Sequence, residues 1–139
     1  MTMLKRNKDL IFGKMNENNN LPIIRKFFGI TNLEMDKNEY ATIDFKNDDT
    51  LIELKSRRIT HNKYDTCFIG YNKYKYFKKN NDKKSYIVYQ YDDGLFYIQY
   101  DRDLFKKFDR KYQNIWRDNV CEQSKVVLIP TKYLIKIEI

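Results

Sequence analysis

The sequence is poor in residues that break secondary structure, cross-link the chain or bind soft metals. Its 139 residues include 4 glycines, 2 prolines, 2 cysteines and 1 histidine. No repeat or low-complexity segment is present, and no linker divides the chain. The histidine and the cysteines, which form no CxxC pair, are too few for a structural zinc site. We therefore expect Cys67 and Cys121 to be reduced thiols in an intracellular protein.

Long apolar runs and a serine-centred nucleophile motif are also lacking. No run approaches the roughly 18 apolar residues that span a bilayer. The first residues, Met1–Lys8, are not followed by the apolar stretch of a signal peptide. A soluble protein with no membrane partner is therefore expected. A catalytic pair of Cys67 and His61 is conceivable, but a half-buried thiol and a surface imidazole are the more ordinary interpretation.

The composition is that of a globular protein with an excess of positive charge. Hydrophobic residues make up 42% and charged residues 33%, and the length suits a single domain over 1–139. Lysine and arginine number 27 against 19 acidic residues, a formal net charge of +8. Such a charge favours polyanionic partners, nucleic acid first.

Hydrophobic spacing and turn residues predict an alternation of helices and strands. The clearest signal is Asp92-Asp93-Gly94 between two aromatic, β-branched runs, which predicts a hairpin. Residues 109–124 are predicted to be irregular, and 131–139 to form either a helical turn or a terminal strand. Helices are predicted at 5–28 (interrupted at Pro22 and ended by Gly29), 70–79 and 101–108 (capped by Asp101), and strands at 40–45, 51–55, 66–69, 85–91, 95–100 and 126–129.

This order of elements indicates an α/β protein. Helix, strands, helix, strands, helix and strand follow one another, which predicts a mixed sheet with helices packed on it. Within the strand at 51–55, Glu53 and Lys55 share one face because side chains alternate along a strand.

Three residues in this region form a set that carries chemistry. Asp44 lies near the end of one predicted strand, and Glu53 and Lys55 lie in its hairpin neighbour. Two carboxylates supply hard oxygen ligands for Mg²⁺ or Mn²⁺. A bound metal polarises a phosphate and activates water, and a nearby lysine neutralises the charge that develops. The set therefore fits phosphodiester hydrolysis.

The same spacing has a simpler explanation. A Glu-x-Lys string is common in a lysine-rich chain, where it forms a solvated strand face with an ion pair. Asp48 and Asp49 are rival metal ligands, although they belong to the turn between the strands. We prefer Asp44 because it lies closer to the expected active end of the strand.

Context strengthens the catalytic interpretation. Ile43-Asp44 followed by Leu51-Ile52-Glu53-Leu54-Lys55 resembles the motif of the PD-(D/E)xK, or restriction-endonuclease-like, nuclease superfamily. The proline expected before the motif aspartate is replaced by Ile43. The basic, aromatic stretch after the motif and the tyrosine-rich hairpin are similar to those of small viral and phage-type members. The resemblance covers roughly Gly13 to Tyr100.

The resemblance implies a fold, a cofactor and a reaction. It implies a restriction-endonuclease-like mixed sheet flanked by helices, and Mg²⁺- or Mn²⁺-dependent hydrolysis of DNA by an endonuclease, with junction-resolvase-like structure selectivity as one subtype. Glu17, on the preceding helix, is the implied extra acidic residue. A viral member would act in the cytoplasm or nucleus of a host cell. Junction-cleaving relatives act as dimers, which makes a homodimer an expectation by analogy.

Basic residues near the motif are candidates for phosphate contacts. These are Arg57, Arg58, Lys63 and Lys73, for which a solvated loop is the competing interpretation. A second candidate surface combines basic and aromatic residues that could stack on unpaired bases. Its members are Arg110, Lys111, Tyr112, Trp116 and Arg117, with ordinary surface charge and core aromatics as the alternative.

Two other functions stay open. One is a non-catalytic nucleic-acid-binding protein that keeps a nuclease-like fold. The other is an interaction or virion component whose basic surface meets an acidic partner.

Overall fold

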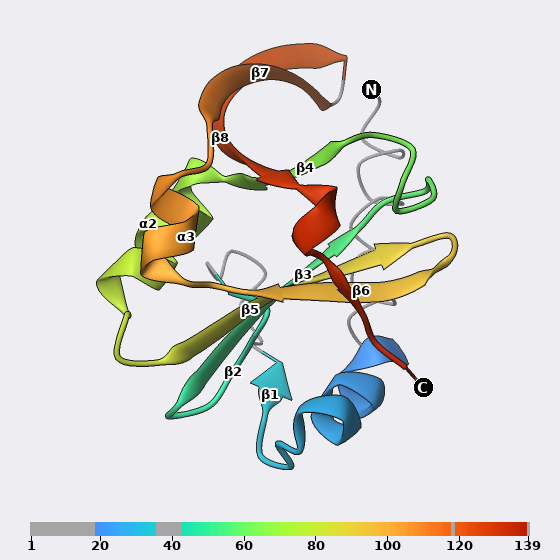
Figure 1. Cartoon of the computed structure of the whole chain (residues 1–139), viewed down its shortest axis with the longest axis vertical. Coiled ribbons are helices and arrows are strands. Elements are labelled where there is room, and N and C mark those ends of the chain that lie inside the picture. Colours follow the sequence, from blue (N-terminus) through green and yellow to red (C-terminus); the bar gives the residue numbers. More distant parts are fainter. Residues whose placement is uncertain (1–18, 36–42, 118, 139) are drawn as a thin grey trace.

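A six-stranded mixed sheet forms the centre of the protein (Figure 1). The computed structural model describes residues 19–35, 43–117 and 119–138. The strand order is β1-β2-β3-β5-β6-β9, and all neighbours are antiparallel except β3 and β5. The strands are β1 (Glu34–Met35), β2 (Phe45–Lys46), β3 (Thr50–Ser56), β5 (Lys84–Tyr91), β6 (Gly94–Gln99) and β9 (Ile135–Lys136).

A second, three-stranded antiparallel sheet lies against the first. Its order is β4-β8-β7, formed by β4 (Thr66–Gly70), β8 (Val120–Pro130) and β7 (Arg110–Arg117). The described helices are a segment at 19–28, α2 (Tyr71–Lys79), α3 (Arg102–Lys106) and the short 3-10 helix η1 (Thr131–Tyr133). The α/β class and the mixed sheet predicted from the sequence are confirmed, whereas the separate second sheet was not predicted.

The parallel pair of β3 and β5 is connected through β4 and α2. Such a pair needs a long crossover, because parallel strands cannot be joined by a tight turn. The register places Glu53 beside Ile87 and Lys55 beside Tyr89. The connection carries the chain out to the second sheet and back along α2, so elements of both sheets meet beside β3.

Strand β3 separates two hydrophobic cores. Leu51 packs into the larger core, with α2, α3 and the second sheet, and Ile52 and Leu54 pack into a smaller core with the helix at 19–28. This division follows from the alternation of side chains along a strand. It confirms that Glu53 and Lys55 share the face on which the second sheet packs.

Local signals for turns and caps are confirmed where the structure describes them. Gly94 in the β5–β6 hairpin has φ of 136°, and Gly29, which ends the helix at 19–28, has φ of 67°. These values lie where glycine has no steric penalty. The N–H of Leu104 donates to Asp101 Oδ1 at 2.8 Å, so Asp101 caps α3.

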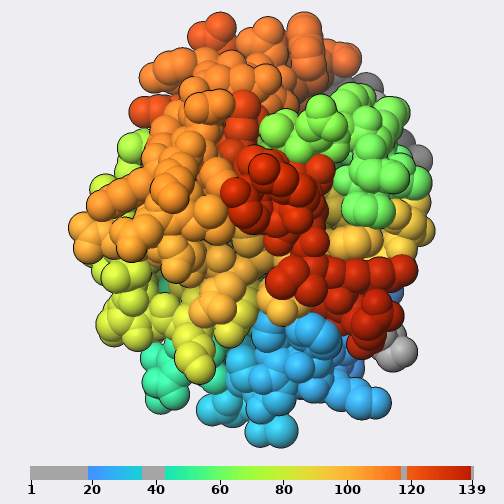
Figure 2. Space-filling view, in the orientation of Figure 1, coloured from blue at the N-terminus to red at the C-terminus, as the bar shows by residue number. Residues whose placement is uncertain are grey.

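Two sequence-based predictions differ from the structure. Within 109–124, predicted to be irregular, 110–117 form β7 and 120–124 belong to β8, and this long hairpin lies at one end of the molecule (Figures 1 and 2). Most of these side chains are polar, so they show no apolar alternation that would mark strands. For the strand predicted at 40–45, Ile43 and Asp44 form a bend, Phe45 begins β2, and 40–42 lie outside the described residues.

Residues 131–138 contain both a helical turn and a strand, the two alternatives that the sequence left open for this segment. After β8, η1 makes one helical turn and β9 then pairs with β6. For the predicted helix at 5–28, only 19–28 lies within the described residues, and that part is helical, with Pro22 inside it. No described helix is long and apolar enough to cross a membrane.

Candidate active site

The predicted catalytic residues line one pocket. Asp44 precedes β2, and Glu53 and Lys55 belong to β3. All three line a pocket of about 290 Å³ at the end of β3. Asp44 and Glu53 are therefore on the same side of the sheet, as a shared site requires. The other lining residues are Leu54, Ser56, Arg57, Phe68 and Ile115.

Asp44 is held in place by the neighbouring strand. The backbone N–H of Leu54 donates to Asp44 Oδ2 at 2.9 Å. The preceding residue, Ile43, is buried and anchors the bend that presents the aspartate. Because Leu54 lies between Glu53 and Lys55, this bond ties Asp44 to the Glu-x-Lys segment itself.

Glu53 is a buried carboxyl group that lacks a complete set of partners. Its exposed fraction is 5%, its Oε2 lies 3.2 Å from Lys73 Nζ, and its Oε1 has no hydrogen-bond partner among the described residues. Burial raises the pKa of Glu53 well above its ordinary value, and the nearby charge of Asp44 raises this pKa further. Lys73 and Lys55 lower it, but by less.

Lys73 does not line the pocket but contacts the site through Glu53. The sequence suggested a phosphate contact, but α2 directs the ammonium group to Glu53. The side chain of Lys73 is 21% exposed, so this ion pair is screened less than a surface pair. It supplies a positive charge where two carboxyl groups meet.

Lys55 and Arg57 share an aromatic neighbour that sequence analysis missed. Lys55 Nζ lies 4.7 Å from the centroid of the Phe68 ring, and Arg57 Cζ lies 4.2 Å from it. Such cation–π contacts hold long side chains over a ring face. Phe68 is on β4, and Ile115, also missed, is on β7. Cys67 and Ile69 are buried in the larger core, so alternation along β4 turns Phe68 to the other face, but alternation alone does not indicate this pocket.

The remaining predicted residues lie elsewhere. Arg58 and Lys63 are exposed and do not line the pocket, and Lys63 Nζ lies 5.5 Å from the Tyr64 ring. Asp48 and Asp49 are exposed in the turn before β3. Glu17 lies outside the described residues.

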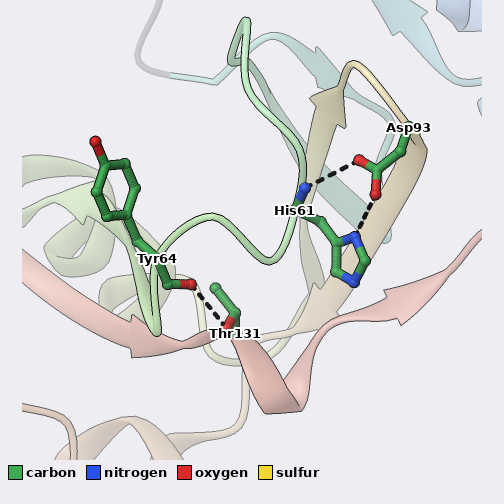
Figure 3. Close-up of polar contacts among 4 residues, drawn as sticks. All are labelled: His61, Tyr64, Asp93 and Thr131. Carbon is green, nitrogen blue, oxygen red and sulfur yellow. Dashed lines mark hydrogen bonds and ion pairs between the residues drawn. The ribbon is translucent and has the colours of Figure 1, made fainter.

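Cys67 and His61 do not form a catalytic pair. The backbone N–H and the Nδ1 atom of His61 both bond the carboxylate of Asp93 (Figure 3). The Cys67 thiol is buried and donates to Ile129 O. The bond to His61 lowers the pKa of Asp93, whereas burial raises the pKa of Cys67. Figure 3 also shows Thr131 Oγ1 donating to Tyr64 O, so these contacts hold the loop after β3.

The second surface suggested by the sequence is divided. Arg110 donates to Phe108 O at 2.7 Å and lies over Tyr74, so it has a structural role. Tyr112 and Trp116 are 68% and 69% exposed, and Lys111 is exposed. The side chain of Arg117 lies outside what the structure describes.

Within the described part of the chain, no group of three or more histidine, cysteine, aspartate or glutamate side chains gathers in metal-binding geometry. The pocket therefore offers two carboxylates, with any further ligand drawn from water, backbone or substrate. Comparison of the chain with family models, with curated proteins and with solved structures found no match.

Proposed function

We propose that the protein is a Mg²⁺- or Mn²⁺-dependent nuclease that hydrolyses DNA phosphodiester bonds, acting as an endonuclease. The observation that carries the proposal is the buried Glu53 carboxyl group, with one unpartnered oxygen, beside Asp44 and Lys55 in one pocket. A buried polar atom without a partner is costly. Such sites are retained where a ligand supplies the missing partner.

The donor set suits a hard divalent cation. Mg²⁺ is commonly held by one or two carboxylates and keeps several waters or substrate oxygens. Asp44 and Glu53 would supply the two carboxylates, with Oε1 of Glu53 as the oxygen that the ion pair leaves available. When bound, the ion polarises the scissile phosphate and lowers the pKa of an attacking water.

The protein's own groups have distinct tasks in this reaction. Lys55 orients the attacking water by donating a hydrogen bond to it, and its positive charge balances the negative charge that develops on the phosphate. Lys73 holds Glu53 through the ion pair and favours its ionised form. Arg57, stacked on Phe68, contacts a phosphate at the pocket wall. The water oxygen loses a proton to solvent and bonds to phosphorus while the bond to the leaving oxygen breaks, and the leaving oxygen takes up a proton from solvent.

The test is cleavage by the purified protein and one pair of lysine variants. Plasmid, linear duplex, single-stranded and four-way-junction DNA would each be incubated with Mg²⁺, Mn²⁺ or EDTA. Lys55→Ala should abolish metal-dependent cleavage. Lys84→Ala is the matched control, because Lys84 begins β5 on the same sheet but lines a different pocket.

The contrary result has a definite meaning. If the wild type cleaves no substrate with either metal but binds DNA in a salt-sensitive manner, the nuclease proposal fails. The protein would then be a nucleic-acid-binding protein with a nuclease-like arrangement of residues.

A further inference from the structure

The hairpin of β7 and the paired residues 120–127 of β8, called the ribbon below, has two different faces. Side chains alternate along a strand, so Tyr112, Asn114 and Trp116 lie on one face of β7 and Gln113 and Ile115 on the other. The face that carries Tyr112, Asn114 and Trp116 is called the aromatic face. Any role for the ribbon has to account for both faces.

The aromatic face is exposed and carries groups suited to bases. The exposed fractions of Tyr112 and Trp116 are 68% and 69%, and Asn114 is also exposed. Across the ribbon, the exposed Gln123 lies opposite Asn114 and the exposed Cys121 lies opposite Trp116. Four residues of strand separate the two rings by about 13 Å, several times the 3.4 Å between bases stacked along a strand. Each ring can therefore take a separate base.

The other face belongs to the pocket. Ile115 lines the same pocket as Asp44, Glu53 and Lys55, together with Phe68 from β4. One face of the ribbon therefore lines the candidate active site, and the aromatic face is the opposite face. A strand held in the pocket and a strand held on the aromatic face would be on opposite sides of it.

The root of the ribbon is fixed to the site through α2. Arg110 Cζ lies 4.9 Å from the Tyr74 ring centroid, and Lys125 Nζ lies 4.1 Å from that of Tyr71. Both tyrosines are on α2, the helix that also carries Lys73 to Glu53. The ribbon therefore has a defined orientation relative to the pocket.

We propose that the ribbon is a wedge that binds the unpaired, uncleaved strand of a forked or branched DNA, with its bases stacked on Tyr112 and Trp116. This rests on the proposed nuclease function and names its substrate class. Aromatic rings stack on any base whose face is free, and a continuous duplex has no such face inside it. The stretch 110–127 has an excess of positive charge, which favours a polyanion: its basic residues are Arg110, Lys111, Arg117 and Lys125, and its acidic residues are Asp118 and Glu122. Of the basic residues, Arg110 and Lys125 also lie over rings of α2.

The test uses the fluorescence of Trp116, which is the only tryptophan in the chain. The full-length protein in EDTA would be titrated with three probes: a single-stranded oligothymidylate, a blunt hairpin duplex, and a fork with two oligothymidylate arms. Stacking should quench the emission, and the fork and the single strand should do so at concentrations at least about tenfold lower than the duplex. EDTA keeps the measurement independent of cleavage.

Variants and a chemical probe complete the test. Tyr112→Ala and Trp116→Ala should each weaken binding of labelled fork DNA, followed by anisotropy, by roughly tenfold or more. Tyr64→Ala is the matched control, because Tyr64 is 58% exposed and lies outside the ribbon. Fork DNA should also slow alkylation of Cys121, which is exposed, while Cys67 is buried.

Each contrary result has its own meaning. Anisotropy-detected binding of the fork without quenching, or equal quenching by duplex and fork, overturns the wedge. Emission that depends on protein concentration without DNA would instead assign the aromatic face to a second copy of the chain. Selective quenching by the fork, without cleavage under any metal, would retain the wedge as a binding element while the proposed nuclease function fails.

Discussion

The two ends of strand β3 both carry acidic residues, but in opposite physical states. Before its first residue, Asp48 and Asp49 are exposed in a turn, beside a pocket of about 580 Å³ that Asp49 helps to line. Toward its last residue, Glu53 is buried beside Asp44 and two lysines in a pocket of about 290 Å³. The larger of these two pockets therefore lies beside the exposed carboxylates, and the smaller one beside the buried carboxyl group.

This contrast shows which property indicates function. Exposed carboxylates in a turn remain hydrated and cost the fold little. Burial and a neighbouring carboxyl group both disfavour the ionisation of a carboxyl group. An unpartnered oxygen adds to the free energy that its burial costs. Pocket size does not separate the two ends of the strand, but burial and unsatisfied polarity do.

The largest expected effect separates the acidic residues of the two ends. Asp44→Asn and Glu53→Gln should each lower the rate of Mg²⁺-dependent cleavage by at least about 100-fold, because each removes a charged metal ligand. Asp49→Asn, the same change at the other end, should stay within about threefold of wild type, since rim charges act weakly. The measurement is initial rate on the preferred substrate; equal losses at both ends would contradict the contrast.

A second effect concerns the ion pair at the buried end. Lys73→Ala removes a positive charge that lowers the pKa of Glu53, so this pKa should rise further. Cleavage at neutral pH should fall by about tenfold, and part of the loss should be recovered at higher pH, where Glu53 ionises. The pH–rate profile measures this.

Lys78→Ala, an exposed position on the same helix, is the control and should leave the pH–rate profile in place. If Lys73→Ala lowers the rate equally at every pH, Lys73 does not act through the ionisation of Glu53.

A third effect tests the structural role of the turn. Asn47 Oδ1 accepts hydrogen bonds from the N–H groups of Asp49 and Thr50 at 2.8 and 2.7 Å. Asn47→Ala should therefore lower the free energy of unfolding by about 1–2 kcal/mol, measured by urea denaturation. The cleavage rate of the folded variant should stay unchanged, and Asp48→Ala serves as the control. A large loss of rate with little loss of stability would give the turn a functional role.

The smallest effect is a gain in stability at the buried end. The raised pKa of Glu53 means that the folded protein favours the neutral carboxyl group. Its contribution to stability is present below the unfolded pKa and is lost as pH rises through the folded pKa. Glu53→Gln mimics the neutral form, so its Tm should exceed that of wild type by a few degrees at pH 8. The difference should vanish near pH 4, and a difference independent of pH would contradict this assignment.

The sequence by itself determined the local elements and the candidate catalytic set. Alternation along β3 placed Glu53 and Lys55 on one face, and turn residues predicted the β5–β6 hairpin and the Asp101 cap. These features depend on neighbours in the chain, and backbone geometry transmits them without tertiary information. Asp44 could be predicted because a short turn brings β2 beside β3.

Only the tertiary structure decided which distant groups complete the site. Phe68 from β4 and Ile115 from β7 reach the pocket because the β3–β5 crossover brings the second sheet against β3, and Lys73 from α2 reaches Glu53. The β7–β8 ribbon itself went unrecognised because its polar, exposed side chains show no alternating pattern. Pairing between the two strands, rather than burial of one face, defines it. Contacts between elements far apart in the chain leave no periodic signal in either segment, so they become visible only in the folded protein.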